Sequence, residues 1–394
     1  MRVLILHNRY QIPGGEDVAV CQEEEMLAQG GVDVERIEVS NDGIVSARDK
    51  MQAMATAIYS PGMRRHVATA IARFRPDILH VHNLFPRLSP SVYGAAARTP
   101  CAVVQTLHNY RLLCPNAQLL RNHAPCNDCL GKVFAWPGVI HGCYRNSVAA
   151  SASVAAMSAV HRVLGTWNSD VDQFIVLTEF ARDLFVRFSG IAEARLTIKP
   201  NSVRDPGLGE GEGRYALYVG RLSEEKGLLH LIDAALGGEG LGMPLRIAGS
   251  GPLESVVLGA ARAGRIEFLG AQHRSAVLDL MKNAAVLAFP SIWFEGFPMV
   301  IAEAFACGLP VIAGRLGAMA ELIEDGVNGL LIAPGSAAEL RGAVRRLSST
   351  PGFRGALARG ARRTYLDKYS PERNLQQLLA IYAQARDRKV RKLI

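Results

Sequence analysis

Residues 284–303, AAVLAFPSIWFEGFPMVIAE, contain the pattern that decides the fold. A short apolar run up to Ser291 has the length and composition of a strand buried on both faces, as in a parallel sheet. A loop follows, and Pro298 marks the start of a helix near Phe297, because proline is favoured in a first helical turn. The stretch therefore predicts one strand–loop–helix unit of an α/β domain.

The loop and helix of this stretch carry groups that suit a phosphorylated sugar ligand. Free amides at a helix start favour a diphosphate, and Gly296 allows the backbone to approach a ligand closely. Glu295 and Glu303 are placed to line one wall, and carboxylates accept hydrogen bonds from sugar hydroxyls. The alternative is an ordinary strand–loop–helix with one surface glutamate and one buried salt bridge.

The same alternation of apolar runs and helical patterns extends along the whole chain. It predicts two doubly wound, Rossmann-like domains that face a central cleft. The expected strands of the first half are 2–8, 34–40, 77–83, 101–109 and 173–179, and those of the second half are 215–220, 245–251, 266–270, 284–291, 310–314 and 329–334.

Two breaks in the pattern set the expected domain limits. We expect an N-terminal domain over residues 1–200 and a C-terminal domain over residues 201–370, with a Gly- and Pro-rich linker at 199–213. Pro371 then starts an amphipathic helix, which we expect to extend over 371–394 and to pack back on the N-terminal domain.

Composition narrows the function classes. The 394 residues are 49% hydrophobic and 20% charged, which excludes a disordered chain and a small disulfide scaffold. No uninterrupted apolar run is long enough to cross a membrane and no signal peptide is evident, so we expect a cytoplasmic protein. Residues 51–150 hold 10 basic and 2 acidic side chains. Such a surface suits anionic lipid or a phosphorylated acceptor better than nucleic acid.

Further candidate residues follow other predicted strands. Arg221 and Lys226 lie in one loop and could clamp a diphosphate, although a solvated helix start explains them as well. Gly251 lies in a glycine turn that could pass near a nucleotide base. Gly14 and Gly15 permit close backbone approach after the first strand, although a plain turn explains them equally well. His108 ends its strand at the carboxyl edge, where functional residues gather.

Four cysteines with the spacing C-x11-C-x2-C-x13-C fall in a long loop. Cys114, Cys126, Cys129 and Cys143 could hold a structural zinc ion, and inert reduced thiols are the alternative.

Together these motifs resemble the retaining GT-B glycosyltransferases of family 4, over nearly the whole chain. The E-x7-E pair is Glu295 and Glu303, within EGFPMVIAEAFACGLPVIAG, and YVGRLSEEKG, IAGSGP and DGVNGLLI are in register. The opening HNRYQIPGGED and the run TLHNYRLLCPN are similar to the branch that builds bacterial surface polysaccharides.

The resemblance implies a role for each matching residue. Glu295 would hold hydroxyls of the transferred sugar, Glu303 the ribose, and Arg221 and Lys226 the diphosphate, while His108 would stabilise the reacting centre. The rest of the implied donor site is Gly14, Gly15, Gly251, Leu269, Gly296, Phe297, Pro298, Met299 and Val300. The reaction would need no metal, since cations and helix-start amides neutralise the leaving group.

We therefore expect a retaining glycosyltransferase. It would move a sugar from a UDP- or GDP-sugar to a lipid-linked saccharide, carried on a polyprenyl diphosphate, or to an oligosaccharide, at the inner face of the plasma membrane. Three alternatives stay open: a nucleotide-sugar epimerase of the same fold, a non-catalytic nucleotide-sugar-binding protein, and a Rossmann dehydrogenase.

Overall fold

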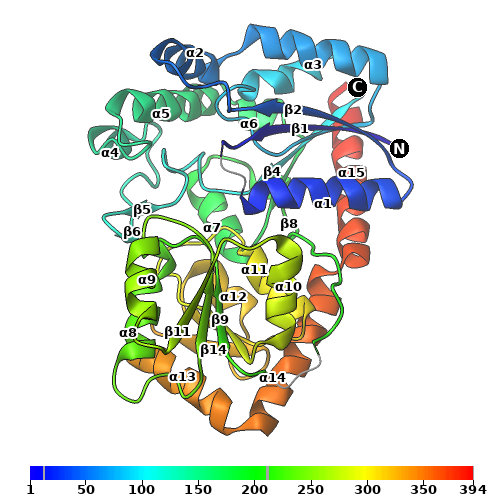
Figure 1. The fold of residues 1–394 in the computed structure, drawn as a ribbon. Coiled ribbons are helices and arrows are strands. Elements are labelled where there is room, and N and C mark those ends of the chain that lie inside the picture. The colour runs from blue at the N-terminus through cyan, green and yellow to red at the C-terminus, as the bar shows by residue number, and fades with distance from the viewer. Residues whose placement is uncertain (12–13, 210–212, 394) are drawn as a thin grey trace. The chain divides into compact units, whose positions relative to one another are not determined.

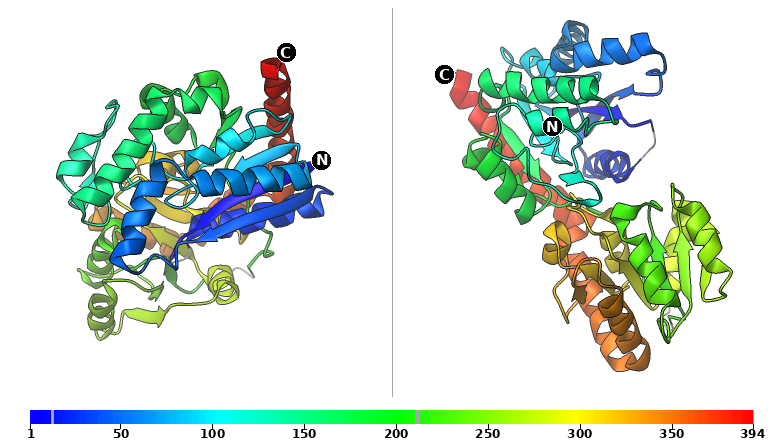
Figure 2. Two further views of the ribbon diagram at one scale, coloured as in Figure 1. Left: turned by 90° about the horizontal axis from the view of Figure 1, so that it is seen from above. Right: turned by 90° about the vertical axis from the view of Figure 1, so that its left-hand side faces the viewer.

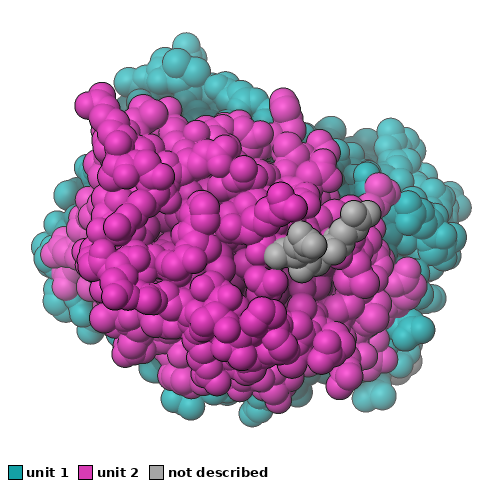
Figure 3. Space-filling model, turned by 60° about the horizontal axis from the view of Figure 1, so that its bottom comes forward, with its two compact units in different colours: residues 1–119, 126–201, 374–394 teal, residues 120–125, 202–373 magenta. Residues whose placement is uncertain are grey.

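A computed structural model describes residues 1–11, 14–209 and 213–393, and divides them into two compact units. Unit 1 comprises residues 1–119, 126–201 and 374–394, and unit 2 comprises residues 120–125 and 202–373; Figure 3 colours them separately. Residues 210–212 of the expected linker, and Ile394 at the end of the expected C-terminal helix, lie outside the described residues.

Unit 1 is built on a six-stranded parallel sheet with the order β2-β1-β3-β4-β7-β8. Its strands are β1 (Arg2–Arg9), β2 (Asp33–Ser40), β3 (Ile78–Val81), β4 (Ala102–Leu107), β7 (Gln173–Val176) and β8 (Leu196–Ile198). Its helices are α1 (Gly15–Gln29), α2 (Ala47–Ile58), α3 (Pro61–Phe74), α4 (Trp136–Ile140), α5 (Val148–Val163), α6 (Thr166–Ser169), α7 (Glu179–Phe188) and the greater part of α15 (Pro371–Leu393). Figure 1 labels these elements.

Helix α15 belongs to the core of unit 1 although it ends the chain. Leu378, Ile381, Tyr382 and Ala385 of this helix pack with Val3 and Ile5 of β1, and each is at most 3% exposed. Pro371 is its first residue, as the sequence predicts. The last helix therefore completes one face of the first sheet. The left view of Figure 2 shows it as a red ribbon close to the N-terminal strand.

Unit 2 repeats the architecture with a sheet of order β11-β10-β9-β12-β13-β14, again entirely parallel. Its strands are β9 (Ala216–Val219), β10 (Leu245–Ala248), β11 (Ile266–Gly270), β12 (Val286–Phe289), β13 (Val311–Gly314) and β14 (Gly329–Ile332). Its helices are α8 (Leu228–Leu236), α9 (Glu254–Ala261), α10 (Arg274–Asn283), α11 (Met299–Ala306), α12 (Gly317–Leu322), α13 (Ala337–Ser349) and α14 (Pro351–Thr364). A short hairpin, β5 (Leu120–Arg121) and β6 (Ala124–Pro125), is grouped with it.

Both sheets confirm the predicted doubly wound α/β class. In each unit the chain runs outward from the first strand and then crosses to the other side, so the loops at the carboxyl ends of the strands gather at one edge. The candidate residues of both units lie in such loops or in the helices that follow them. No helix among the described residues is long and apolar enough to cross a membrane.

Candidate functional site

The carboxylate of Glu295 accepts three side-chain hydrogen bonds in unit 2. It follows β12, and its residue is only 6% exposed. Its Oε1 atom accepts from the Ser291 hydroxyl at 2.8 Å, from Trp293 Nε1 at 2.9 Å and from Lys226 Nζ at 2.7 Å. Buried carboxylates need such donors, since an unpaired one would carry a large desolvation cost. The structure therefore unites two residues that the sequence analysis placed in separate motifs.

Lys226 reaches Glu295 because its loop presses against the end of β12. The next residue, Gly227, has φ +70, and a Cβ there would lie 1.9 Å from the carbonyl oxygen of Pro290. Only glycine fits both demands. The Lys226 ammonium also lies over the rings of Phe289 and Trp293, at 5.6 and 5.2 Å from their centroids. These contacts hold one positive charge beside the carboxylate and leave it 20% exposed.

Arg221 differs from Lys226 although the two share a loop. Its side chain is exposed, and no contact of its guanidinium is found in the described part of the chain. Its neighbour Leu222 is fixed by backbone hydrogen bonds to Ser250 and from Leu253, both at 2.9 Å. A Cβ on Gly251 would lie 2.5 Å from the carbonyl oxygen of Leu222, so a glycine lets the two loops meet. The Arg221 guanidinium is therefore exposed to solvent, while the backbone next to it is held by hydrogen bonds.

Glu303 lies on α11, and its side chain is 13% exposed. Its Oε1 atom is 2.9 Å from a guanidinium nitrogen of Arg274, the first residue of α10. Burial raises the pKa of Glu303, and Arg274 offsets only part of that rise. Arg274 was not a candidate from sequence, because it belongs to no motif and meets Glu303 only through the packing of α10 on α11.

The remaining donor-site candidates of unit 2 lie in β11, in the loops that follow β10 and β12, and at the start of α11. Helix α11 begins at Met299, two residues after the predicted position, with Pro298 as its N-terminal cap, and strand β12 ends at Phe289 and not at Ser291. The loop between them is thus longer than predicted, since Pro290 cannot donate to the sheet ladder. Phe297 packs its ring on Tyr369 at 5.6 Å. The carbonyl oxygen of Leu269 accepts from Gln272 Nε2 at 2.5 Å.

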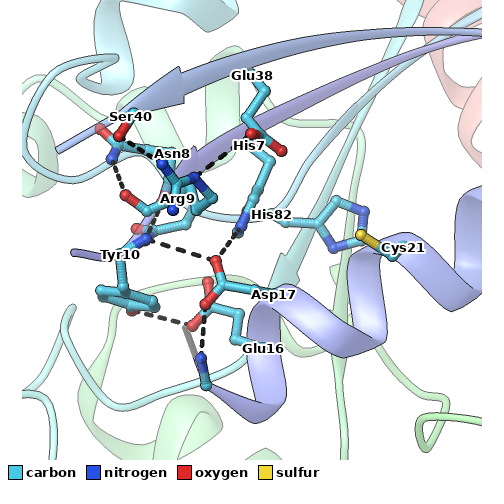
Figure 4. A network of polar contacts seen from close by, with 12 residues as sticks. His7, Asn8, Arg9, Tyr10, Glu16, Asp17, Cys21, Glu38, Ser40 and His82 are labelled. Atoms are coloured by element: carbon cyan, nitrogen blue, oxygen red, sulfur yellow. Dashed lines mark hydrogen bonds and ion pairs between the residues drawn. The ribbon is translucent and has the colours of Figure 1, made fainter. Parts of the chain in front are cut away.

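In unit 1 a polar network surrounds the start of α1 (Figure 4). Asp17 Oδ2 accepts from the Gly14 amide at 2.8 Å, and its Oδ1 lies 2.8 Å from His7 Nε2. Glu16 accepts from the hydroxyl of Tyr10 at 3.0 Å. A Cβ on Gly14 would meet nothing within 4 Å, so open space borders this glycine, while its amide is already used by Asp17. Gly15 is the exposed first residue of the helix.

His108 follows β4 in unit 1 and heads a second polar cluster. Its Nε2 atom lies 2.9 Å from Nδ1 of His82, and the two rings are stacked with centroids 5.2 Å apart. Glu23, His80 and His82 lie behind it with ligand-type atoms within 4.8 Å of one another. Lys199 Nζ, 2.9 Å from Glu23 Oε2, already supplies the positive charge that this carboxylate needs. We therefore interpret the cluster as hydrogen-bonded side chains and not as a metal centre.

The cysteine loop does not form a metal-binding group. None of the seven cysteines forms a disulfide, and no three of the four candidate sulfur atoms gather within 4.8 Å in the described residues. The thiol of Cys114 instead donates to Asn116 Oδ1 at 2.9 Å. The residues as they lie do not fit a zinc ion, and the structural zinc stays a prediction from spacing alone.

Solved structures of other proteins share the fold of this chain. Sucrose-phosphate synthase from Thermosynechococcus elongatus aligns with 98% of this chain and 99% of its own, with a TM-score of 0.71 and 19% identity. HepE of Anabaena, solved in complex with UDP, aligns with 97% of this chain and 100% of its own, with a TM-score of 0.67 and 18% identity. The protein therefore has the GT-B fold of glycosyltransferases.

Family models make the assignment specific. Residues 2–202 match the family described as glycosyl transferase 4-like domain, and residues 203–364 match glycosyl transferases group 1. The chain belongs to this family, the group 1 glycosyltransferases of family 4.

Individual relatives cover different shares of the chain. Glycogen synthase of Mycobacterium tuberculosis is 28% identical over 79% of this chain and 69% of its own length. An uncharacterized glycosyltransferase of Methanocaldococcus jannaschii is 31% identical over 47% of this chain. The chain spans about half the length of this archaeal relative (48%) and of a second one from the same organism (50%).

Proposed function

We propose that the protein is a retaining glycosyltransferase that takes a sugar from a nucleotide-sugar donor. The observation that carries the proposal is the buried Glu295 carboxylate, held by Ser291 and Trp293 and paired with Lys226 at the carboxyl end of a parallel strand. Family membership gives this arrangement its meaning, and the HepE structures with UDP and with UDP-glucose make a uridine nucleotide the first ligand to test.

Each group of unit 2 has a proposed task. The ammonium of Lys226 has three N–H donors, so it can keep Glu295 and also bind a phosphate oxygen. Arg221 would close on the same diphosphate from its exposed position, and the pair would neutralise the charge that develops as the nucleotide leaves. Glu295 would accept from hydroxyls of the transferred sugar, and Glu303 from the ribose. None of these steps requires a metal ion.

We further propose a lipid-linked saccharide as the acceptor, at the inner face of the plasma membrane and in the assembly of a surface polysaccharide. The support is the basic excess of residues 51–150, since each Lys or Arg near an anionic bilayer contributes about 1 kcal/mol. Binding to vesicles with and without anionic lipid tests this part. Equal binding to the two would contradict it.

The donor site is tested by calorimetric titration of the full chain with UDP, GDP and ADP, without added metal. We expect one nucleotide to bind selectively. Lys226→Ala should weaken that binding about 10–100-fold, because a charge-assisted hydrogen bond contributes about 1.5–3 kcal/mol. Glu303→Ala should weaken it less, and Lys368→Ala, which removes an exposed lysine of the same unit, should not change it.

The possible results separate the competing functions. Failure of all three nucleotides to bind would contradict the donor site and favour a role that involves no sugar transfer from a nucleotide donor. Conversion of a nucleotide sugar without any acceptor would instead indicate an epimerase. Equal loss of affinity in Lys226→Ala and Lys368→Ala would show that net charge, and not the Lys226–Glu295 pair, attracts the nucleotide.

A further inference from the structure

A line of polar contacts in unit 1 leads inward from His108 to a buried ion pair. His108 Nε2 lies 2.9 Å from His82 Nδ1, and His82 Nε2 lies 3.4 Å from Glu23 Oε1. Glu23 Oε2 is 2.9 Å from Lys199 Nζ. His82, Glu23 and Lys199 are 4%, 6% and 1% exposed. The four residues come from the ends of β4 and β3, from α1 and from the segment after β8, so the line depends on the tertiary fold.

The inner end of this line carries a fixed charge. Lys199 donates both to Glu23 and, at 2.8 Å, to Asn374 Oδ1 at the start of α15. Burial alone would raise the pKa of Glu23, but Lys199 and then His80 outweigh it and hold that pKa well below its usual range. Glu23 is therefore a carboxylate, and a carboxylate oxygen can only accept hydrogen bonds.

That restriction determines where the protons of the histidines lie. His82 Nε2 has no hydrogen-bond partner among the described residues unless it donates to Glu23 Oε1, 3.4 Å away, an oxygen that also lies 3.1 Å from His80 Nδ1. Buried polar atoms are rarely left unsatisfied, so His82 should carry its proton on Nε2, where both atoms gain from it. Its Nδ1 atom is then a bare acceptor. The contact at 2.9 Å must be donated by His108, from an Nε2–H.

We propose that Glu23 and His82 are positioning residues that fix the tautomer of His108, with the proton on Nε2 and a lone pair on Nδ1. Among the described residues no hydrogen-bond partner of this Nδ1 is found, so it is available to a ligand. It would accept from a hydroxyl of the transferred sugar, and this last step rests on the proposed function.

The surroundings keep both rings neutral. Burial lowers the pKa of His82 to about 3 and also lowers that of His108, and neighbouring imidazoles add to both shifts. The groups that face the line are His7 from β1, His80 from β3 and Tyr382 from α15. His80 Nε2 lies 2.8 Å from the Thr106 hydroxyl, and His80 Nδ1 lies 2.8 Å from the Tyr382 hydroxyl and 3.1 Å from Glu23 Oε1. A neutral His108 acts on a ligand as a hydrogen-bond acceptor and not as a cation.

The tautomer is measurable in the full chain without any ligand. Protein labelled with nitrogen-15 in histidine gives long-range proton–nitrogen spectra in which protonated and bare ring nitrogens have distinct shifts. The His108 signals are assigned by their loss in His108→Gln. We expect the protonated shift at Nε2 and the bare shift at Nδ1. The opposite assignment in the unaltered protein would overturn the proposal.

The role of Glu23 is tested with a matched pair of variants on α1. A glutamine amide can donate or accept, so in Glu23→Gln the tautomer is no longer imposed, and the two nitrogen shifts of His108 should move toward each other. Glu24→Gln changes a partly exposed carboxylate that pairs with Arg36, and should leave them unchanged. Unchanged shifts in Glu23→Gln would remove Glu23 from the proposal.

A second variant covers poor folding of Glu23→Gln. His82→Phe keeps a stacked ring but removes the acceptor, so the His108 shifts should again move together. These spectra do not depend on nucleotide binding. A protein that binds a nucleotide but shows Nδ1–H overturns only this inference, whereas one with the expected tautomer and no nucleotide binding overturns only the proposed function.

Discussion

Each unit contains a carboxylate–lysine pair with a short separation, but the two pairs differ in how far the lysine is exposed. Glu23 and Lys199 in unit 1 lie 2.9 Å apart with side chains 8% and 1% exposed. Glu295 and Lys226 in unit 2 lie 2.7 Å apart, but there the lysine is 20% exposed. In unit 1 the pair is closed on all sides by the fold. In unit 2 the cation is partly open to solvent, beside the exposed Arg221, and so can meet an anionic ligand.

The difference extends to how each pair is assembled. Glu23 and Lys199 are 176 residues apart, and His80 and Tyr382, in the same cluster, are 302 apart. The partners of Glu295 include Ser291 and Trp293, four and two residues away. The comparison teaches that Glu295 takes two of its three donors from its own loop and Lys226 from 69 residues away, while the buried cluster depends on partners much more distant in sequence.

The largest effect that we expect to distinguish the two pairs is the loss of stability in Lys199→Met. Removing one partner of a buried ion pair leaves an uncompensated charge, and we expect a loss of about 3–5 kcal/mol in the free energy of unfolding. Lys226→Met should cost much less, since Ser291 and Trp293 still donate to Glu295. Chemical denaturation followed by circular dichroism measures both.

The control for this measurement is Lys50→Met, which alters an exposed lysine of unit 1. Glu23→Gln combined with Lys199→Met should recover part of the loss, because the two effects are coupled. Equal destabilisation by Lys199→Met and Lys226→Met would break the distinction between the pairs.

This division explains how much of the fold the sequence could predict. Every strand expected from an apolar run is present, because runs such as VLIL in β1 are buried on both faces. Strand β8, with three residues of which two are half-buried, carries too short a pattern to be recognised. Hairpin β5–β6, with two-residue strands, escapes for the same reason.

The same limit applies to the candidate residues. Lys226 and Glu295 could be proposed because each lies in a recognisable loop, but their direct contact could not, since it depends on how Gly227 fits against Pro290. Arg274 and Glu23 carry no local signal at all. The proposed role of His82 rests on its contact with His108 in the fold. Sequence patterns thus indicate which edge of a sheet holds candidate residues, while the pairing of their side chains can be read only from the fold.

Acidification should change the stability of the two units differently. We expect this effect to be smaller than that of Lys199→Met and larger than that of Ser291→Ala. In unit 1, burial lowers the pKa of His82 to about 3. When the pH is below the usual histidine pKa of about 6.5, His82 is protonated in the unfolded chain but stays neutral in the folded unit. The free energy of unfolding therefore falls as pH decreases. For His82 this amounts to about 2 kcal/mol at pH 5, at about 1.4 kcal/mol per pH unit. His161 and His108 shift in the same direction.

In unit 2, Glu303 has the opposite effect on the pH dependence of stability. Burial raises the pKa of Glu303, so its contribution favours the folded state at low pH and is lost as pH rises through the folded pKa. Hydrogen exchange at pH 7 and pH 5, corrected for intrinsic rates, should show unit 1 losing protection first. His82→Phe should reduce that loss and His66→Gln, at an exposed site, should not. Parallel loss of protection in both units would contradict the assignment.

The smallest expected effect is that of Ser291→Ala, and it separates the structural from the ligand-binding part of the unit 2 cluster. Glu295 would lose one donor, at 2.8 Å, and keep Trp293 and Lys226. A hydrogen bond to a charged group contributes about 1.5–3 kcal/mol, and retained donors should bring the loss to the lower end of that range. Since Lys226 remains in place, affinity for the preferred nucleoside diphosphate should change little. Urea denaturation and calorimetry on one preparation measure the two quantities, with Ser349→Ala on α13 as the control. A fall in affinity as large as that of Lys226→Ala would mean that Ser291 holds the cation in its binding position, and the cluster would then act on its ligand as a single unit.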